Sequence, residues 1–148
     1  MKGKLKVGED CVGVGGGVLI FNKKREIFLQ KRGKKSRNEV GKWEKPGGRV
    51  EYGETAVIAM KREVKEETGL NINIWGYLPH TDHIIKKQKQ HWVAFNYLAD
   101  IKSGKAENKE PHKFDEIGWF NLKNLPKNIA QPTREAVKNY KAKKYIKL

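Results

Sequence analysis

The first part of the chain alternates apolar runs and polar turns in a pattern that predicts a β-hairpin. Val12–Phe21 is apolar and β-prone, and the polar turn Asn22–Glu26 leads from it into a second apolar run, Ile27–Arg32. Two such runs joined by a short polar turn are typical of a hairpin. The glycines Gly15–Gly17 weaken the first strand, so they indicate a bulge or the close approach of another segment.

The clearest helical pattern covers Thr55–Thr68. Val57, Met60 and Val64 recur at the spacing of one helix face and form an apolar stripe. The threonine at the start can cap the first turn, and Gly69 directly after the last turn can end the helix. We therefore expect an amphipathic helix that packs its stripe against a core.

The remaining segments predict a mixed sheet flanked by helices. Strands are expected over short β-prone runs at Ile72–Leu78, Trp92–Ile101 and Glu116–Phe120. Helical segments are expected as one turn at Leu122–Leu125 and as a terminal helix, opened by its proline, at Pro132–Tyr145. Non-helical connections are expected at Gly33–Lys42, Trp43–Val50 and Ser103–Pro111. Strands before and after the central helix favour an α+β or α/β fold with a central mixed sheet.

Composition predicts one globular domain over residues 1–148. The chain has 37% hydrophobic residues and four Trp, enough to bury a sizeable core. No apolar run approaches the length of a membrane span, and Met1–Val7 is too basic for a secretion signal. Cys11 is the only cysteine, which excludes an internal disulfide and a Cys-rich zinc site and favours a buried thiol. We expect a soluble, cytoplasmic protein with no membrane partner.

The net charge of +15 raises the question of a nucleic-acid partner. Lys and Arg make phosphate contacts, and nucleic-acid-binding proteins gather them on one face. Here only six of the 32 basic residues are Arg, and the Lys residues are spread from Lys2 to Lys147. Background composition is the favoured interpretation, because base recognition favours the planar guanidinium of Arg. Attraction of a polyanion, either RNA or a phosphate-bearing small molecule, is the alternative.

Three glutamates lie within two turns of the predicted central helix. Glu63, Glu66 and Glu67 share one side of it, where like charges repel each other. Glu63 and Glu67 border the apolar stripe, so they are partly desolvated and need a cation. Oxygen donors of this kind suit a hard divalent ion, Mg²⁺ or Mn²⁺, and Gly47 and Gly48 would let the backbone approach it. For the helix taken alone, an ordinary Lys- and Glu-rich surface helix is the alternative interpretation.

The spacing around these glutamates decides between the two interpretations. The specified positions are Gly48, Glu54, Arg62-Glu63-Val64, Glu66-Glu67 and Gly69-Leu70. In this order, the groups are separated by five, seven, one and one residues. All nine positions match the signature of the Nudix hydrolases, which the chain therefore resembles. A match of this length argues against the surface-helix interpretation.

The resemblance covers roughly residues 12 to 140. Gly41–Gly48 is similar to the segment that leads into the signature in MutT-type nucleoside triphosphate pyrophosphatases, and Glu26–Arg32 resembles their preceding hairpin strand. The later half of the same subgroup is resembled by Glu110–Lys113, Trp119-Phe120 and Leu125-Pro126. The resemblance implies the Nudix α/β/α sandwich.

Roles for the signature residues follow from the same resemblance. Family members cleave a nucleoside diphosphate linked to a further moiety, through attack of water at phosphorus. Glu63 and Glu67 would be the principal ligands of Mg²⁺, with Mn²⁺ as an alternative ion, helped by Glu66 and the Gly47 carbonyl. Phosphoryl transfer depends mainly on charge neutralisation and alignment, which bound metal ions supply.

Two further signature residues and a general base complete the implied machinery. Arg62 would orient the carboxylates, and Glu54 would join it directly or through a metal-bound water. The general base is left open between Glu63 and Glu110, which lies on the loop before Phe114. The neighbouring loop carboxylates are more often simply solvated.

Outside the signature, the resemblance makes Arg32 a candidate phosphate contact and Gln131 a candidate base contact. A surface Arg at a strand end and a Gln at a helix start are the alternatives. Trp119 and Phe120 could stack on a base, although packing in the core is favoured. The four histidines do not have a metal-ligand spacing. Asp82 and His83 could lie near the site, but Thr81–His83 is expected to be a turn.

The expected function is hydrolysis of (deoxy)nucleoside triphosphates, including modified ones such as 8-oxo-dGTP, to monophosphate and pyrophosphate. Alternative substrates are ADP-ribose, dinucleoside polyphosphates and the 5′ end of RNA. A non-catalytic nucleotide- or RNA-binding module is the alternative from another class, and the intact set of acidic residues argues against it. The expected partner is a nucleotide, with nucleic acid not favoured. Related enzymes are often dimers, so a homodimer is also considered.

Overall fold

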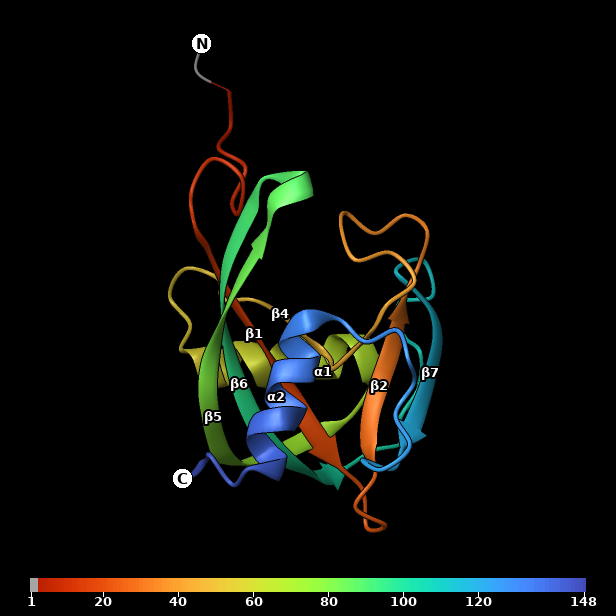
Figure 1. Ribbon diagram of the computed structural model, residues 1–148. Coiled ribbons are helices and arrows are strands. Elements are labelled where there is room, and N and C mark those ends of the chain that lie inside the picture. Colours follow the sequence, from red (N-terminus) through yellow and green to blue (C-terminus); the bar gives the residue numbers. More distant parts are fainter. Residues whose placement is uncertain (1–2) are drawn as a thin grey trace.

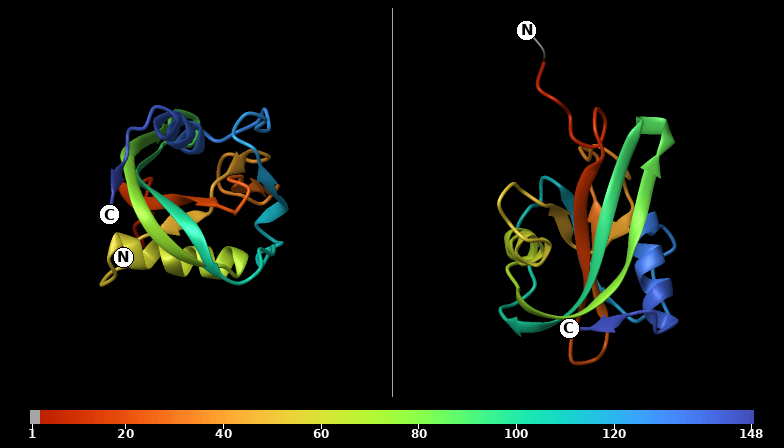
Figure 2. Two further views of the ribbon diagram at one scale, coloured as in Figure 1. Left: turned by 90° about the horizontal axis from the view of Figure 1, so that it is seen from below. Right: turned by 90° about the vertical axis from the view of Figure 1, so that its left-hand side faces the viewer.

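A computed structural model describes residues 3–148, leaving Met1 and Lys2 outside the described residues. A mixed sheet forms the centre, and its two main helices lie on opposite sides of it (Figures 1 and 2). The helices are α1, Ala56–Thr68, and α2, Gln131–Lys141. The strands are β1 Gly13–Phe21, β2 Ile27–Arg32, β3 Trp43–Glu44, β4 Gly47–Arg49, β5 Asn71–Ile85, β6 Gln90–Ser103, β7 Phe114–Phe120 and β8 Ile146–Lys147. This arrangement confirms the expected mixed sheet flanked by helices.

Strand β1 connects the two halves of the sheet. Along its whole length it runs parallel to β6, which forms a long antiparallel hairpin with β5, and β8 extends that edge. At its end β1 pairs with β2 through Phe21 and Ile27, and β2 also pairs with β3 and β7. The start of β1 pairs instead with β4. The sheet therefore divides at β1 into two sets of strands, one with β2, β3 and β7 and the other with β6, β5 and β8. Strand β4 brings the glycine-rich segment beside α1.

Alternating side chains of β1 supply both sides of the core. Val18 and Ile20 pack with Met60 and Val64 of α1, whereas Leu19 packs with residues of α2. The second cluster holds the buried side chains of Leu19, Phe21, Ile27, Leu29, Leu78, Leu98, Ala136 and Val137. Because consecutive side chains of a strand point to opposite faces, one apolar strand can anchor both helices. The two helices are thereby fixed relative to the sheet.

Helix α1 has the boundaries and the apolar stripe that the sequence predicts. The Thr55 hydroxyl accepts a hydrogen bond from the Ile58 N–H at 3.2 Å, and Gly69 adopts a left-handed conformation, φ 78°, at the C-terminal end. Met60 and Val64 are fully buried. The capping hydroxyl satisfies one of the free N–H groups of the first turn, and glycine accommodates the left-handed end without strain.

The triple glycine of β1 allows a close approach, as the sequence indicates. Gly15–Gly17 pair with Gly47–Arg49 of β4. A Cβ atom on Gly47 would overlap the carbonyl oxygen of Gly16, and one on Gly15 would lie 2.8 Å from the Gly48 oxygen. Glycine on both strands lets the two backbones meet at this point. The contact places Gly47 and Gly48 directly beneath α1.

The structure corrects four local expectations. Thr81–His83 is not a turn, because β5 continues through it to pair with β6. Leu122–Leu125 forms a turn and no helix. The terminal helix ends at Lys141, and the chain turns at Lys143, φ 57°, towards β8. Tyr145, directly before β8, packs on Trp75. Cys11 is exposed, because it lies before β1 in the N-terminal segment.

Within residues 3–148, neither helix is long and apolar enough to cross a membrane.

Candidate active site

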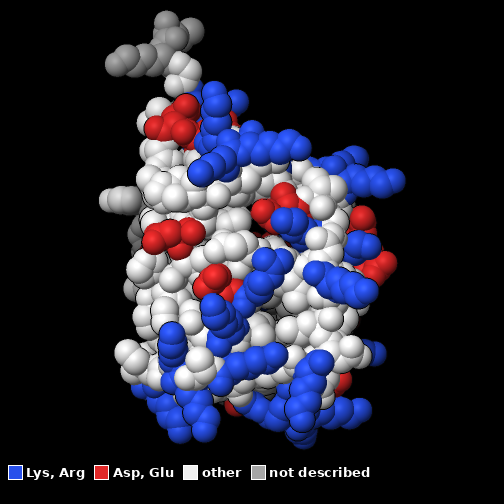
Figure 3. All heavy atoms as spheres, viewed as in Figure 1, with Lys and Arg blue, Asp and Glu red and all other residues white. Residues whose placement is uncertain are grey.

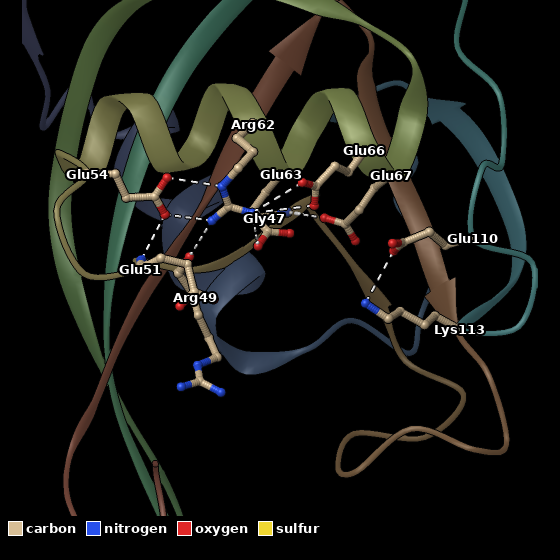
Figure 4. A network of polar contacts seen from close by, with 10 residues as sticks. All are labelled: Gly47, Arg49, Glu51, Glu54, Arg62, Glu63, Glu66, Glu67, Glu110 and Lys113. Atoms are coloured by element: carbon tan, nitrogen blue, oxygen red, sulfur yellow. Dashed lines mark hydrogen bonds and ion pairs between the residues drawn. The ribbon is translucent and has the colours of Figure 1, made fainter.

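Arg62 lies at the centre of a network of acidic side chains (Figure 4). Its guanidinium donates to both carboxylate oxygens of Glu54, at 2.6 and 3.0 Å, and to Glu63 at 2.9 Å. It lies 3.4 Å from Glu66 and also donates to the Arg49 carbonyl at 3.1 Å. The hydrogen bond to Glu54 is the main cause that raises the pKa of Arg62. One cation thus holds three signature carboxylates in fixed positions.

Glu54 holds this network to the loop before α1. Its carboxylate accepts the Glu51 N–H at 2.7 Å in addition to the two bonds from Arg62. The hydrogen bond from Arg62 lowers the pKa of Glu54, and the Glu51 N–H lowers it further. Glu54 is therefore ionised at neutral pH, and the structure joins it directly to Arg62.

Glu67 is the most buried carboxylate of the network, with 4% of its surface exposed. One of its oxygens accepts the Gly47 N–H at 2.9 Å, and the other accepts the Gln30 amide at 2.8 Å. Burial raises the pKa of Glu67 well above its ordinary value, and the neighbouring charge of Glu44 raises it further. Its two hydrogen bonds do not offset this desolvation, so the ionised form needs a cation.

Glu63 and Glu66 differ in exposure as their positions on the helix predict. The Glu63 side chain is 15% exposed and the Glu66 side chain is 51% exposed. Burial raises the pKa of Glu63 despite the nearby Arg62 guanidinium. A Cβ atom on Gly48 would overlap the Glu63 carboxylate, so this glycine leaves the space that the carboxylate occupies. The glycines of β4 and the glutamates of α1 therefore form one site.

The chemistry of this site suits a divalent cation. Within residues 3–148, no three His, Cys, Asp or Glu side chains converge as a ready-made metal site. Nevertheless Glu63 and Glu67 bring carboxylate oxygens into a desolvated site where burial raises both pKa values. Mg²⁺ requires hard oxygen donors and keeps several waters, so it needs few protein ligands. The residues present fit such an ion.

A cavity of about 590 Å³ opens beside the carboxylates. Glu63, Glu67 and the glycines of β1 and β4 form one side of it. Residues 35–39 of the loop after β2, together with Ala130, Pro132 and Thr133 near the start of α2, line other parts. A cavity of this volume is large enough for a nucleotide.

Arg32, the candidate phosphate contact, lines the cavity but already has an acidic partner. Its guanidinium donates to both oxygens of Glu44 at 3.0 and 3.1 Å and to the Asn38 carbonyl at 2.9 Å. Burial raises the pKa of Glu44. Glu44 is not among the site residues that the sequence predicts. Contact between Arg32 and phosphate stays a prediction.

Glu110, the candidate general base, lies beside the end of α1 that carries Glu67 (Figure 4). The loop before β7 is held there because the Lys109 N–H donates to the Glu67 carbonyl at 3.0 Å. The Glu110 side chain is 19% exposed, and one of its oxygens lies 3.4 Å from the Lys113 ammonium. Lys113 also lines the cavity. The structure therefore brings Glu110 to the edge of the site, and its role as a base stays a prediction.

Gln131, the candidate base contact, bonds to another residue at the cavity. Its amide oxygen lies 2.8 Å from Nδ1 of His83, and His83 lines the cavity, 3.8 Å from Glu39. Burial lowers the pKa of His83. The sequence favours a turn at this segment, with a place near the site as the alternative for Asp82 and His83, and the structure places His83 at the cavity. Trp119 and Phe120 pack in the core against Phe28 and Trp43, as expected.

Lys45 is a cavity residue that the sequence did not predict. It follows β3, lines the cavity and has 7% of its surface exposed. Burial lowers the pKa of Lys45 to about 8, although Glu44 acts in the opposite direction. Pro and Gly around it marked a non-helical segment, but no pattern in the sequence indicated burial of a lysine.

Comparison with known proteins places this geometry in a family. A family model described as NUDIX domain matches residues 13–140. The ADP-ribose pyrophosphatase of Methanocaldococcus jannaschii is 33% identical over 121 residues, which cover 82% of this chain and 69% of that protein. The 8-oxo-dGDP phosphatase NUDT18 of Danio rerio is 35% identical over 88 residues, 60% of this chain. The chain spans about a quarter of the length of that protein and of a putative nudix hydrolase of Caenorhabditis elegans.

Solved structures agree with the family model. The MutT NUDIX hydrolase of Burkholderia pseudomallei superimposes with a TM-score of 0.80 at 37% identity, covering 86% of this chain and 97% of that one. A MutT protein of Methanosarcina mazei, at 21% identity and a TM-score of 0.77, shares the fold. Together with the family model and the network around Arg62, these similarities show that the chain belongs to the Nudix hydrolase family.

Proposed function

We propose that the chain hydrolyses (deoxy)nucleoside triphosphates to nucleoside monophosphate and pyrophosphate in a reaction that depends on Mg²⁺. The observation that carries the proposal is the buried pair Glu63 and Glu67, held by Arg62 and by β4 at one end of a nucleotide-sized cavity. Nudix hydrolases generally use a divalent metal and act on nucleotides. Which nucleotide this chain uses is part of the proposal.

In the proposed site, Glu63, Glu66 and Glu67, with the Gly47 carbonyl, would hold the metal. Bound metal would neutralise phosphate charge and lower the pKa of a water ligand. Arg62 keeps Glu63 and Glu66 from moving apart through its bonds to both, and Glu54 fixes Arg62 in turn. The residues are thus positioned before the substrate arrives, which reduces the cost of aligning them during the reaction.

Proton removal from the attacking water needs a base near the carboxylates. Glu110 is the first candidate, because it lies beside the end of α1 and pairs at 3.4 Å with Lys113, which lines the cavity. Glu63 is the alternative, because it lies in the cavity itself. The two assignments are distinguished by substitution of Glu110.

Nucleoside triphosphates are favoured as substrates by the resemblance of the chain to MutT-type enzymes. Relatives named ADP-ribose pyrophosphatase and RNA pyrophosphohydrolase represent two of the alternative substrates, ADP-ribose and the 5′ end of RNA. Figure 3 shows Lys and Arg side chains spread over much of the visible face and not confined to one patch. A spread of this kind is weaker support for an RNA path than a continuous basic stripe would be.

The proposal is tested by a hydrolysis panel with identification of products, in Mg²⁺ and in Mn²⁺. The panel contains the common and 8-oxo (d)NTPs, ADP-ribose, a dinucleoside tetraphosphate and a 5′-triphosphorylated RNA. Monophosphate and pyrophosphate from (d)NTPs would support it. Turnover of ADP-ribose or RNA alone would overturn the substrate, and no turnover with any compound would favour a binding module.

A further inference from the structure

Gln30 is a fully buried polar residue on the side of β2 that faces α1. On the same side of the strand, Phe28 belongs to the core cluster that contains Met60, and Arg32 lines the cavity. Gln30 lies between them with none of its surface exposed. An apolar side chain would fill such a position at lower cost, because burial of an amide is unfavourable unless its hydrogen bonds are replaced. The position therefore needs an explanation beyond packing.

The amide of Gln30 is oriented by its contact with Glu67. Its NH₂ group donates to one carboxylate oxygen of Glu67 at 2.8 Å, while the Gln30 oxygen is buried without a hydrogen-bond partner. An ionised carboxylate can only accept, so this contact requires the amide to present its NH₂ group. Buried polar atoms are usually paired. The unpaired oxygen therefore indicates that the bond to Glu67 decides which way the amide points.

Glu67 is positioned separately from the other acidic residues of the signature. Arg62 bonds to those three carboxylates. Within residues 3–148, Glu67 instead accepts from the Gly47 N–H at 2.9 Å and from the Gln30 amide, which is its one side-chain donor. The two donors bond to different oxygens of the carboxylate and so fix its plane, and each oxygen keeps a lone pair for a further ligand.

The backbone that carries Gln30 is held by strands on both sides. Gln30 pairs with Glu44 of β3 and with Ile117 of β7. A fully buried side chain that starts from a fixed backbone has little freedom to move, because the interior is closely packed. Gln30 can therefore fix the carboxylate of Glu67 from β2, across the contact between the sheet and α1.

We propose that Gln30 is a positioning residue that holds the Glu67 carboxylate in place for the divalent metal. This inference rests on the proposed function, in which Glu67 is a metal ligand. A carboxylate that is fixed before the metal arrives loses less conformational freedom on binding it. Replacing a residue that bonds to a metal ligand typically costs about 10–100-fold in metal affinity or activity. Gln30 acts through Glu67 and not on the substrate, because it does not line the cavity.

The test measures Mn²⁺ binding without substrate, from the EPR signal of free Mn²⁺, and the Mg²⁺ dependence of dGTP hydrolysis. Gln30→Met removes the donor and nearly keeps the length of the side chain. Gln90→Met is the matched control, because Gln90 is also buried, 3% exposed, but bonds to Asn38 and Trp92 instead of a signature carboxylate. Melting temperatures check that each variant is folded.

Gln30→Met should weaken Mn²⁺ binding about 10–100-fold and raise the Mg²⁺ concentration for half-maximal activity by a similar factor. At saturating Mg²⁺ its kcat should recover most of the loss, because the residue acts on metal affinity. Gln90→Met should keep the Mn²⁺ affinity of the wild type. Unchanged Mn²⁺ affinity in Gln30→Met, whatever its activity, would overturn the proposal. An equal loss in both variants would overturn it as well, since it would show a general effect of losing a buried glutamine.

A second measurement uses the wild-type protein and does not depend on the folding of a variant. In ¹⁵N NMR, the side-chain NH₂ signals of Gln30 should shift when Mg²⁺ is added, because the amide bonds directly to a metal ligand. Those of Gln90 should shift much less. The absence of a shift at Gln30 would contradict the proposal.

Failure of the proposed function can be told apart from failure of this inference. A wild-type protein that binds Mn²⁺ but hydrolyses no triphosphate would overturn the function, and the Mn²⁺ affinities would still test Gln30. A wild-type protein that binds neither Mn²⁺ nor Mg²⁺ would overturn the role of Gln30 itself.

Discussion

Replacement of Glu67 by glutamine is predicted to stabilise the metal-free protein while removing its activity. Glu67 accepts the Gly47 N–H and the Gln30 amide, and glutamine can keep the first of these bonds. The Gln30 amide oxygen is buried without a hydrogen-bond partner. Rotation of that amide would let it accept a bond from the new NH₂ group. The substitution therefore removes a charge without creating a cavity.

The expected gain follows from the direction of the pKa shift of Glu67. Burial raises the pKa in the folded state, whereas the unfolded value is about 4.3. The folded state thus binds this proton more tightly, so the stability contribution of Glu67 is highest below pH 4.3. It declines as the pH rises from there through the folded pKa. Above that pKa the folded protein contains a desolvated anion, and its removal is expected to stabilise by about 1–4 kcal/mol.

Thermal unfolding in EDTA at pH 8 and pH 5 measures this effect. At pH 8, Glu67→Gln should raise the melting temperature by about 2–4 °C for each kcal/mol gained, and at pH 5 the gain should shrink. Glu66→Gln is the control, because that side chain is 51% exposed and should leave the melting temperature nearly unchanged. A destabilised Glu67→Gln protein at pH 8, or a gain independent of pH, would refute the reasoning.

Three further substitutions test the arrangement of the site. Arg62→Met should lower kcat by about a hundredfold, because the carboxylates lose their common partner, and single-turnover kinetics would measure the loss. Gly48→Ala should displace the Glu63 carboxylate and reduce kcat about tenfold or more, with circular dichroism showing an intact fold. Glu110→Gln should reduce turnover about 10²–10⁴-fold if it is the base, while Glu107→Gln leaves turnover unchanged. Unchanged kcat in Glu110→Gln would leave Glu63 as the base.

The sequence predicted the parts of the site that depend on local spacing. The limits of α1, its cap and the graded burial of its glutamates follow from positions on one helix. Arg62 and Glu54 are eight residues apart, yet they meet because the loop before α1 turns back, with the Glu51 N–H bonded to Glu54. The family signature supplied that pairing, which periodicity alone does not contain.

Residues brought in by long-range pairing could not be predicted in the same way. His83 lies in the cavity because β5 continues past its register shifts to pair with β6, and the local sequence there resembles a turn. Gln30 and the adjacent residues Glu44 and Lys45 are polar, and their burial depends on the strands that surround them. The early end of α2 depends likewise on β8 joining the sheet edge. Tertiary contacts override local preference at each of these places.

The most direct test of the central claim is product identification by ³¹P NMR after incubation of wild-type enzyme with dGTP and Mg²⁺. The account predicts dGMP and pyrophosphate in equal amounts, formed by the wild-type enzyme and reduced by orders of magnitude in Glu67→Gln. Release of orthophosphate with dGDP would show cleavage of a different bond. Undiminished pyrophosphate release by Glu67→Gln would contradict the assignment of the buried carboxylate to the reaction.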